Sequence, residues 1–155
     1  MLPSAILPPS HVRLPLGAST KRDAIRELCA LLASTTGADV AAIQRAVEDR
    51  EEKLSTGIGF GVAIPHGRSP AVAEVGLVAG VTRQPIPFQA IDGQPVRLLF
   101  LLVGPDTAAG DHVRLLSKIA RLVRREPVRQ RLLDAADADR FVDALASAER
   151  DLLTA

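Results

Sequence analysis

The segment from Val96 to Val103 reads VRLLFLLV and is apolar at every position except Arg97. It is far too short to cross a lipid bilayer as a helix. Nearly continuous apolar character over so few residues is typical of a strand that is covered on both faces of a sheet. Other elements must supply that cover, and helices are the usual choice. The segment therefore predicts a central strand with helices above and below it.

Helices and strands are expected to alternate around this segment. Further strands are expected at residues 11–16, where Pro15 indicates an edge position, in a short segment that ends at Ile64, and at residues 75–82. Ser19–Thr20 and Asp111 are expected to cap helices. Apolar residues at helical spacing predict helices over residues 21–34, 39–52, 111–125, a short one from Pro127, and 138–153. Because the connections are irregular, we predict an α/β fold with a mixed β-sheet flanked by helices on both faces.

The chain has 155 residues, enough for one domain with a sizeable core. Residues 1–10 are rich in proline and lack basic residues, so we expect a flexible, extended N-terminal tail and no secretory signal. Residues 11–155 are expected to form the domain. The formal net charge is +1, from 19 basic and 18 acidic side chains, and Trp and Tyr are absent. This balance argues against a nucleic-acid binder.

Cys29 is the only cysteine, and it falls among apolar residues at helical spacing. We interpret it as an inert core residue, and no internal disulfide or cysteine-ligated zinc site can form. The three histidines lack the spacing of metal ligands, so we expect neither metal nor cofactor. With no transmembrane segment expected, the sequence favours a cytoplasmic, reducing setting without membrane insertion.

Residues 55–67, STGIGFGVAIPHG, contain glycine at every second position from 57 to 61. They match neither a dinucleotide fingerprint nor a nucleotide-hydrolase phosphate loop. A face without side chains allows close packing or the approach of another group to the backbone. His66 lies between Pro65, which fixes its own φ, and the permissive Gly67. Its imidazole can offer a neutral, nucleophilic nitrogen. On these residues alone, a reactive and a structural His66 are equally open.

Other polar residues have simpler structural interpretations. His112 shares a helical stripe with apolar residues, as a core histidine would. His11 falls in the expected edge strand and is interpreted as structural. Arg50 is most simply a solvated surface residue. The hydroxyl of Thr56 can donate to a ligand or, more commonly, bond to nearby backbone.

Residues 49–67, DREEKLSTGIGFGVAIPHG, closely resemble the signature of the type-2 EIIA domains of the bacterial phosphotransferase system, the mannitol/fructose class. The resemblance extends over residues 10–153. The pieces PIPF (85–88) and DGQP (92–95) look more like the nitrogen-regulatory branch than the mannitol branch. Lys53 and Leu54 replace the Leu-Gly that many members have, which puts the loop before the glycines in question.

The resemblance implies the same mixed sheet flanked by helices and a histidine phosphocarrier function. His66 matches the histidine that accepts a phosphoryl group on Nε2. His112 matches the second histidine, which steadies that group, and Arg50 matches the arginine that also serves it. Thr56 is expected to add a hydrogen-bond donor. Whether such a phosphotransferase component counts as an enzyme stays open.

The resemblance also implies partners. The donor would be HPr or its nitrogen-branch paralogue, and Ile58 and Phe60 are expected to form an apolar docking patch for it. In a regulatory role the phosphocarrier binds a transporter or sensor kinase according to its phosphorylation state. In a sugar-specific role it passes phosphate to an EIIB permease domain. A non-catalytic protein-binding module is the alternative from another class, and the intact His66, His112 and Arg50 argue against it.

Overall fold

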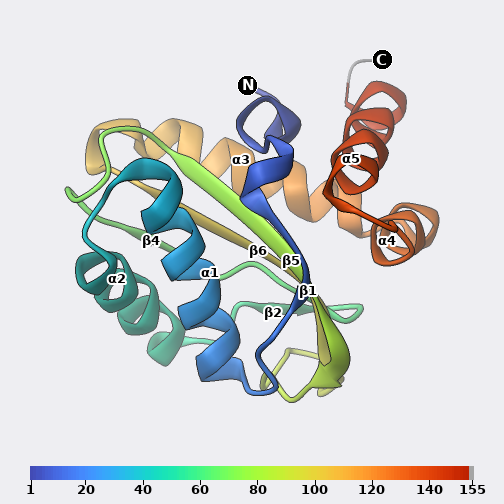
Figure 1. Ribbon diagram of the computed structural model, residues 1–155, viewed down its shortest axis with the longest axis horizontal. Helices are drawn as coiled ribbons and strands as arrows, with labels where there is room; N and C mark the ends of the chain where they lie inside the picture. The colour runs from blue at the N-terminus through green and yellow to red at the C-terminus, as the bar shows by residue number, and fades with distance from the viewer. Residues whose placement is uncertain (154–155) are drawn as a thin grey trace.

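The computed structural model describes residues 1–153, and a mixed sheet forms its centre (Figure 1). The strand order is β1-β5-β6-β3-β2, and β4 also pairs with β6. β6 runs antiparallel to β5 but parallel to β3 and β4. The predicted mixed sheet is therefore confirmed. The strands are β1 (Val12–Leu16), β2 (Gly57–Gly59), β3 (Val62–Ala63), β4 (His66–Arg68), β5 (Gly76–Ile86) and β6 (Val96–Gly104).

Helices cover both faces of this sheet, as the sequence predicts. In Figure 1, α1 and α2 lie on one side of the strands, and α4 and α5 lie on the other. None of the helices within residues 1–153 combines the length and apolar character that a membrane-spanning segment requires. The helices are α1 (Lys21–Thr36), α2 (Val40–Lys53), α3 (Ala109–Val123), α4 (Glu126–Leu133) and α5 (Ala138–Leu152).

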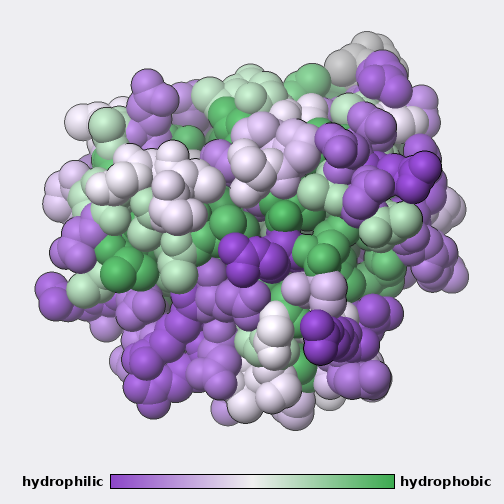
Figure 2. Space-filling view, in the orientation of Figure 1, coloured by the Kyte–Doolittle hydropathy of each residue, from purple (hydrophilic) through white to green (hydrophobic). Residues whose placement is uncertain are grey.

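β6 is the central strand, and alternate side chains of it enter two separate apolar clusters. One cluster lies under α3, α4 and α5, and the other lies under α1 and α2. In Figure 2, the lower parts of α1 and α2 are covered by hydrophilic residues, whereas their upper parts have a mixed surface. The strand is therefore covered on both faces, which confirms the prediction from its apolar run. The first cluster receives Leu98, Phe100 and Leu102, and the second receives Leu99, Leu101 and Val103.

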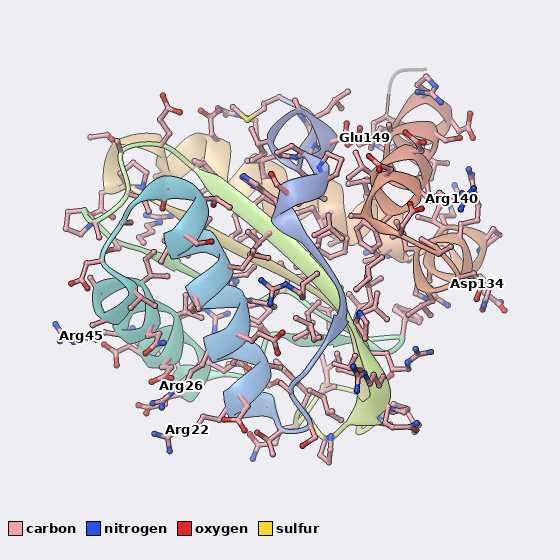
Figure 3. All side chains as sticks on the ribbon, viewed as in Figure 1. Arg22, Arg26, Arg45, Asp134, Arg140 and Glu149 are labelled. Carbon is pink, nitrogen blue, oxygen red and sulfur yellow. The ribbon has the colours of Figure 1, made fainter. Side chains whose placement is uncertain are left out.

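The N-terminal segment differs from the extended tail that we expected. Residues Pro3–Ile6 and Pro9–His11 form short 3-10 helices, and Leu7 is buried in the core cluster under α5. The carboxylate of Glu149 in α5 accepts hydrogen bonds from the amide and the hydroxyl of Ser4, beside the N-terminal turn (Figure 3). Contacts with the far end of the chain hold the segment in this conformation. The last two positions of the expected domain, 154–155, lie outside the described residues.

Two element boundaries also differ from the predictions. Asp111 does not cap a helix: α3 begins at Ala109, after a 3-10 helix at Asp106–Ala108, and Asp111 in its first turn bonds to Arg114. β5 continues to Ile86, beyond the predicted end at Thr82. In contrast, Thr20 caps α1 as expected, and its hydroxyl accepts the amide hydrogen of Asp23.

The packing of α2 on β4 leads to a first prediction. A Cβ at Gly67 would lie 2.9 Å from the backbone carbon of Ala46 in α2, and backbone cannot yield as a flexible side chain does. We expect Gly67→Ala to lower the free energy of unfolding by about 1–3 kcal/mol, measured by urea denaturation. Gly17→Ala is the control, because its new Cβ would make only ordinary contact. Equal stability of the two variants would contradict the close packing.

Candidate functional site

His66 begins β4, where the chain resumes pairing with β6 after the break at Ile64 and Pro65. Its Nδ1 lies 2.8 Å from the carbonyl oxygen of Ile64. A carbonyl oxygen only accepts hydrogen bonds, so Nδ1 carries the proton in the neutral ring. Nε2 is then left with its lone pair. The ring is half-buried, and its nucleophilic nitrogen is defined by this one bond.

The surroundings of His66 favour the neutral ring. Burial is the main cause that lowers the pKa of His66, and the hydrogen bond to Ile64 opposes it in part. The nearby guanidinium groups of Arg50 and Arg68 lower the pKa further, and the Glu51 carboxylate raises it. An imidazole held neutral near pH 7 keeps a lone pair available for attack on an electrophile.

His112 lies in the first turn of α3 and faces His66. The ring centroids are 5.6 Å apart, with an angle of 63° between the ring planes. His112 is only 2 % exposed, and its Nδ1 has no hydrogen-bond partner among residues 1–153. A buried N–H without an acceptor is rarer than an unpaired acceptor, so we place the proton of His112 on Nε2. The ring is therefore buried, but it is not the satisfied core histidine that its helical stripe suggests.

Burial also lowers the pKa of His112, to about 4, and the positive charges that His66 and Arg68 can carry contribute. Both rings are therefore neutral at neutral pH, and the inferred tautomers are complementary. His66 offers a lone pair at Nε2, whereas His112 offers an N–H at Nε2. Such a pair can present a nucleophile and a hydrogen-bond donor to the same ligand.

Arg50 lies in the last turn of α2, and its Nη1 donates to the carbonyl oxygen of Leu54 at 2.8 Å. This bond secures one end of the guanidinium and leaves its remaining N–H groups available. Arg50 and His66 line two adjoining cavities together. One, of about 500 Å³, also contains Lys53, Arg68 and His112 on its walls. The structure thus brings His66, His112 and Arg50 around a cavity whose wall has more basic side chains than acidic ones, although Asp49 also lines it.

Thr56 does not offer its hydroxyl to this cavity as we expected. The side chain is buried, and its hydroxyl donates to a carboxylate oxygen of Glu51 at 2.5 Å. The amide of Thr56 donates to the other oxygen of the same carboxylate at 2.9 Å. Because a hydroxyl has one proton, the one on Thr56 is already committed. Thr56 therefore holds the chain in place and does not act as a ligand donor in this structure.

The glycine-rich segment forms a tight hairpin between β2 and β3. Gly59, Phe60 and Gly61 have φ angles of 95°, 61° and 76°. The amide of Phe60 donates to the carboxylate of Asp92, which also accepts the amide of Gln94. Asp92 therefore stabilises both the hairpin turn and the turn in which it lies. A Cβ at Gly57 would lie 2.8 Å from that of Ala90, so the bare face of the segment accommodates close packing.

An apolar surface surrounds the second cavity, of about 430 Å³, beside His66. Ile58 lines this cavity, and Phe60 at the hairpin tip is 56 % exposed with the guanidinium of Arg129 over its ring. Sequence reasoning missed Leu54 and Ile91, which line the same cavity and are 71 % and 85 % exposed. The signal for Ile91 was present, since a large apolar residue directly precedes the Asp-Gly turn.

Two residues that we interpreted as structural lie outside the site. Cys29 is fully buried in α1, and burial raises the pKa of its thiol to about 12, so it is unreactive. His11 bonds through Nδ1 to the carbonyl oxygen of Leu77 at 2.9 Å. Within residues 1–153, no cluster of three or more His, Cys, Asp or Glu side chains is arranged to hold a metal ion.

The depressed pKa of His112 leads to a prediction about stability. As pH falls below about 6.5, the unfolded chain binds a proton on this imidazole before the folded protein does. Its contribution to stability is complete above about pH 6.5 and is lost as pH falls towards 4. The loss amounts to at most about 3 kcal/mol. Urea unfolding of the unsubstituted protein and of His112→Gln at about pH 7 and about pH 4.5 measures it. If both proteins lose the same stability, the pKa of His112 is not depressed.

Known proteins show similarity over nearly the whole chain. Residues 5–148 match the family described as "Phosphoenolpyruvate-dependent sugar phosphotransferase system, EIIA 2". A nitrogen regulatory protein of Bradyrhizobium diazoefficiens is 40% identical over 145 residues, which cover 93% of this chain and 90% of the relative. A fructose-specific EIIA component of Haloferax volcanii is 33% identical over 144 residues, covering 92% of this chain and 94% of the relative.

Solved structures agree with these sequence matches. The crystal structure of the nitrogen regulatory protein IIA-Ntr from Neisseria meningitidis superposes with a TM-score of 0.87 at 35% identity, covering 92% of this chain and 97% of that one. Mannitol enzyme IIA of Escherichia coli, in its complex with phosphorylated enzyme IIB, gives a TM-score of 0.77 at 22% identity, with 89% and 95% covered. The second match supports the fold alone.

Proposed function

Because the chain belongs to the EIIA type-2 family of the phosphoenolpyruvate-dependent sugar phosphotransferase system, we propose that it carries a phosphoryl group on Nε2 of His66. The observation that carries this proposal is the bond from Nδ1 of His66 to the carbonyl oxygen of Ile64. That bond leaves Nε2 as the nitrogen with a lone pair. The neighbouring His112 and Arg50 supply donors at the same cavity.

The transfer exchanges one nitrogen–phosphorus bond for another. The lone pair on Nε2 of His66 attacks the phosphorus of a phosphohistidine on the donor protein. The donor N–P bond breaks, and its electron pair returns to the donor imidazole. The His66 ring then carries phosphorus on Nε2 and the proton on Nδ1, where the Ile64 carbonyl stabilises the gained positive charge. Such a step depends on alignment and charge neutralisation.

The residues around His66 would bind the phosphoryl oxygens and neutralise their charge. Arg50 presents a planar group of N–H donors that suits phosphoryl oxygens. His112 can donate its Nε2 proton to another of these oxygens. Arg68 and Lys53 add positive charge at the cavity wall. Thr56 contributes through the backbone, since its hydroxyl is bonded to Glu51.

We assign the donor and the downstream partners from the chemistry of the site and from similarity to known proteins. The donor would be HPr or its nitrogen-branch paralogue, which would dock on the apolar surface of Leu54, Ile58, Phe60 and Ile91 around His66. Similarity to nitrogen regulatory proteins at 40% and 35% identity favours a regulatory role in the cytoplasm, towards a transporter or sensor kinase. Similarity to a fructose-specific EIIA component supports transfer to an EIIB domain as the second candidate.

Labelling with phosphate tests the assignment of His66. The protein is incubated with the general phosphotransferase enzyme, a carrier and labelled phosphoenolpyruvate. We expect an acid-labile, base-stable label that is lost in His66→Ala, because the proposal places the phosphoryl group on Nε2 of His66. His11→Ala lies outside the site and should label normally. An unlabelled protein would identify a non-catalytic binding module, and equal labelling of His66→Ala would refute the assignment.

Single-turnover phosphorylation tests the two supporting residues. A hydrogen bond to a charged group contributes about 1.5–3 kcal/mol, so loss of one should slow transfer by roughly one to two orders of magnitude. We expect this for Arg50→Ala and for His112→Gln. Arg45→Ala, on the outward side of α2 (Figure 3), is the control and should keep the normal rate. Rates within about twofold of the control would exclude direct contacts with the phosphoryl group.

A further inference from the structure

Glu51 has a buried carboxylate that the proposed mechanism does not use. It lies beside Arg50 in the last turn of α2, and its side chain is 6 % exposed. One oxygen accepts the amide of Thr56 at 2.9 Å and the ammonium group of Lys21 at 2.8 Å. The other accepts the hydroxyl of Thr56 at 2.5 Å. A buried carboxylate with these partners is well stabilised, and it fixes Thr56 at two atoms.

Hydrogen bonds continue from Thr56 to the acceptor ring. The carbonyl oxygen of Thr56 accepts the amide of Ile64 at 3.0 Å, and the carbonyl oxygen of Ile64 accepts Nδ1–H of His66 at 2.8 Å. An unbroken series of bonds therefore joins Glu51 to the imidazole. We propose that Glu51, supported by Lys21, is a positioning residue that fixes the orientation and tautomer of His66. The kinetic consequence rests on the proposed function.

Lys21 is itself held in place at the start of α1. Its ammonium group lies 3.3 Å from the carbonyl oxygen of Phe88 and 4.8 Å from the centre of the Phe88 ring. The hydroxyl of Ser55 donates to the same carbonyl oxygen at 2.8 Å. Lys21 therefore connects α1, α2 and the segment after β5, and Ser55 joins the segment before β2 to the same carbonyl oxygen. Without its positive charge, the buried carboxylate of Glu51 would lose its only ionic partner among residues 1–153.

The connection matters because transfer between two imidazoles depends on alignment. If the carboxylate is lost, the amide and hydroxyl of Thr56 are left buried without an ionised acceptor. The pairing of Thr56 with Ile64 then relaxes, and the Ile64 carbonyl no longer holds Nδ1–H in a fixed direction. A displacement of about 1 Å at a reacting atom can slow a reaction by up to about 100-fold. Glu51 never touches the phosphoryl group in this scheme.

The chain offers a matched control for Glu51. Glu48 lies one turn earlier on α2 and bonds to Arg26 of α1 at 2.9 Å. It therefore also joins the two helices, and Figure 3 shows Arg26 at the edge of α1 that is next to α2. Its bond to Arg26 does not reach the Thr56 segment. Glu51→Gln and Glu48→Gln each replace one carboxylate of a helix–helix ion pair with an isosteric amide.

Nitrogen NMR of the unphosphorylated protein gives the first measurement. Ring 15N shifts report which nitrogen of His66 carries the proton, so this arm does not depend on phosphotransfer. We expect a single Nδ1–H tautomer in the unsubstituted protein and in Glu48→Gln, and a mixture in Glu51→Gln. Identical His66 shifts in all three proteins would overturn the positioning role. If the unsubstituted protein shows the fixed tautomer but accepts no phosphate, the proposed function fails and the positioning role stands.

Transfer rates give the second measurement. We expect Glu51→Gln to accept phosphate about tenfold more slowly and Glu48→Gln to stay within about twofold of the unsubstituted protein. Lys21→Met should also accept phosphate more slowly, and Lys21→Arg, which keeps the charge, should recover most of the rate. The Lys21 variants decide the question if Glu51→Gln does not fold. Equal rates for Lys21→Met and Lys21→Arg would overturn the role of this ion pair.

Discussion

The hydrogen bond between Nδ1 of His66 and the carbonyl oxygen of Ile64 is the constraint on which the site depends. It determines which ring nitrogen is protonated, and therefore which one has a lone pair for the phosphoryl transfer that we propose. It also fixes the direction in which that nitrogen points. Ile64 lies between β3 and β4, and its amide donates to the carbonyl oxygen of Thr56. The acceptor carbonyl is therefore held in place by the segment before β2.

The packing around β4 then brings the other groups to His66. Gly67 lets the backbone of α2 approach β4 closely, which places Arg50 and Glu51 beside His66. β6 ends at Gly104, and α3 begins soon after it, so His112 in the first turn of α3 lies over the start of β4. The site therefore needs no long loop. Each functional side chain belongs to a regular element within a few residues of its end.

The sequence predicted the sheet better than the details of the site. The apolar run of β6 and the helical spacing of its neighbours depend on local patterns, and these identify a covered, mixed sheet. The conformation of residues 1–10 depends on Leu7 and Ser4 contacting helices at the other end of the chain, which no local pattern reveals. The direction of the Thr56 hydroxyl was mispredicted for a related reason. Glu51 lies in a charged stretch of the sequence, where a solvated carboxylate is the usual interpretation. Only the fold shows that it is buried.

The electrostatics of the site suit the phosphocarrier function that we propose. Burial lowers the pKa of both imidazoles, and Arg50, Lys53 and Arg68 bring more positive charge to the cavity wall than the carboxylate of Asp49 offsets. A phosphoryl dianion would balance this excess. Nδ1 of His112, which has no hydrogen-bond partner within residues 1–153, is a cost of the same arrangement, because it reduces the stability of the folded protein. That cost is tolerable if the only proton of the ring is needed at Nε2, where the phosphoryl group would lie.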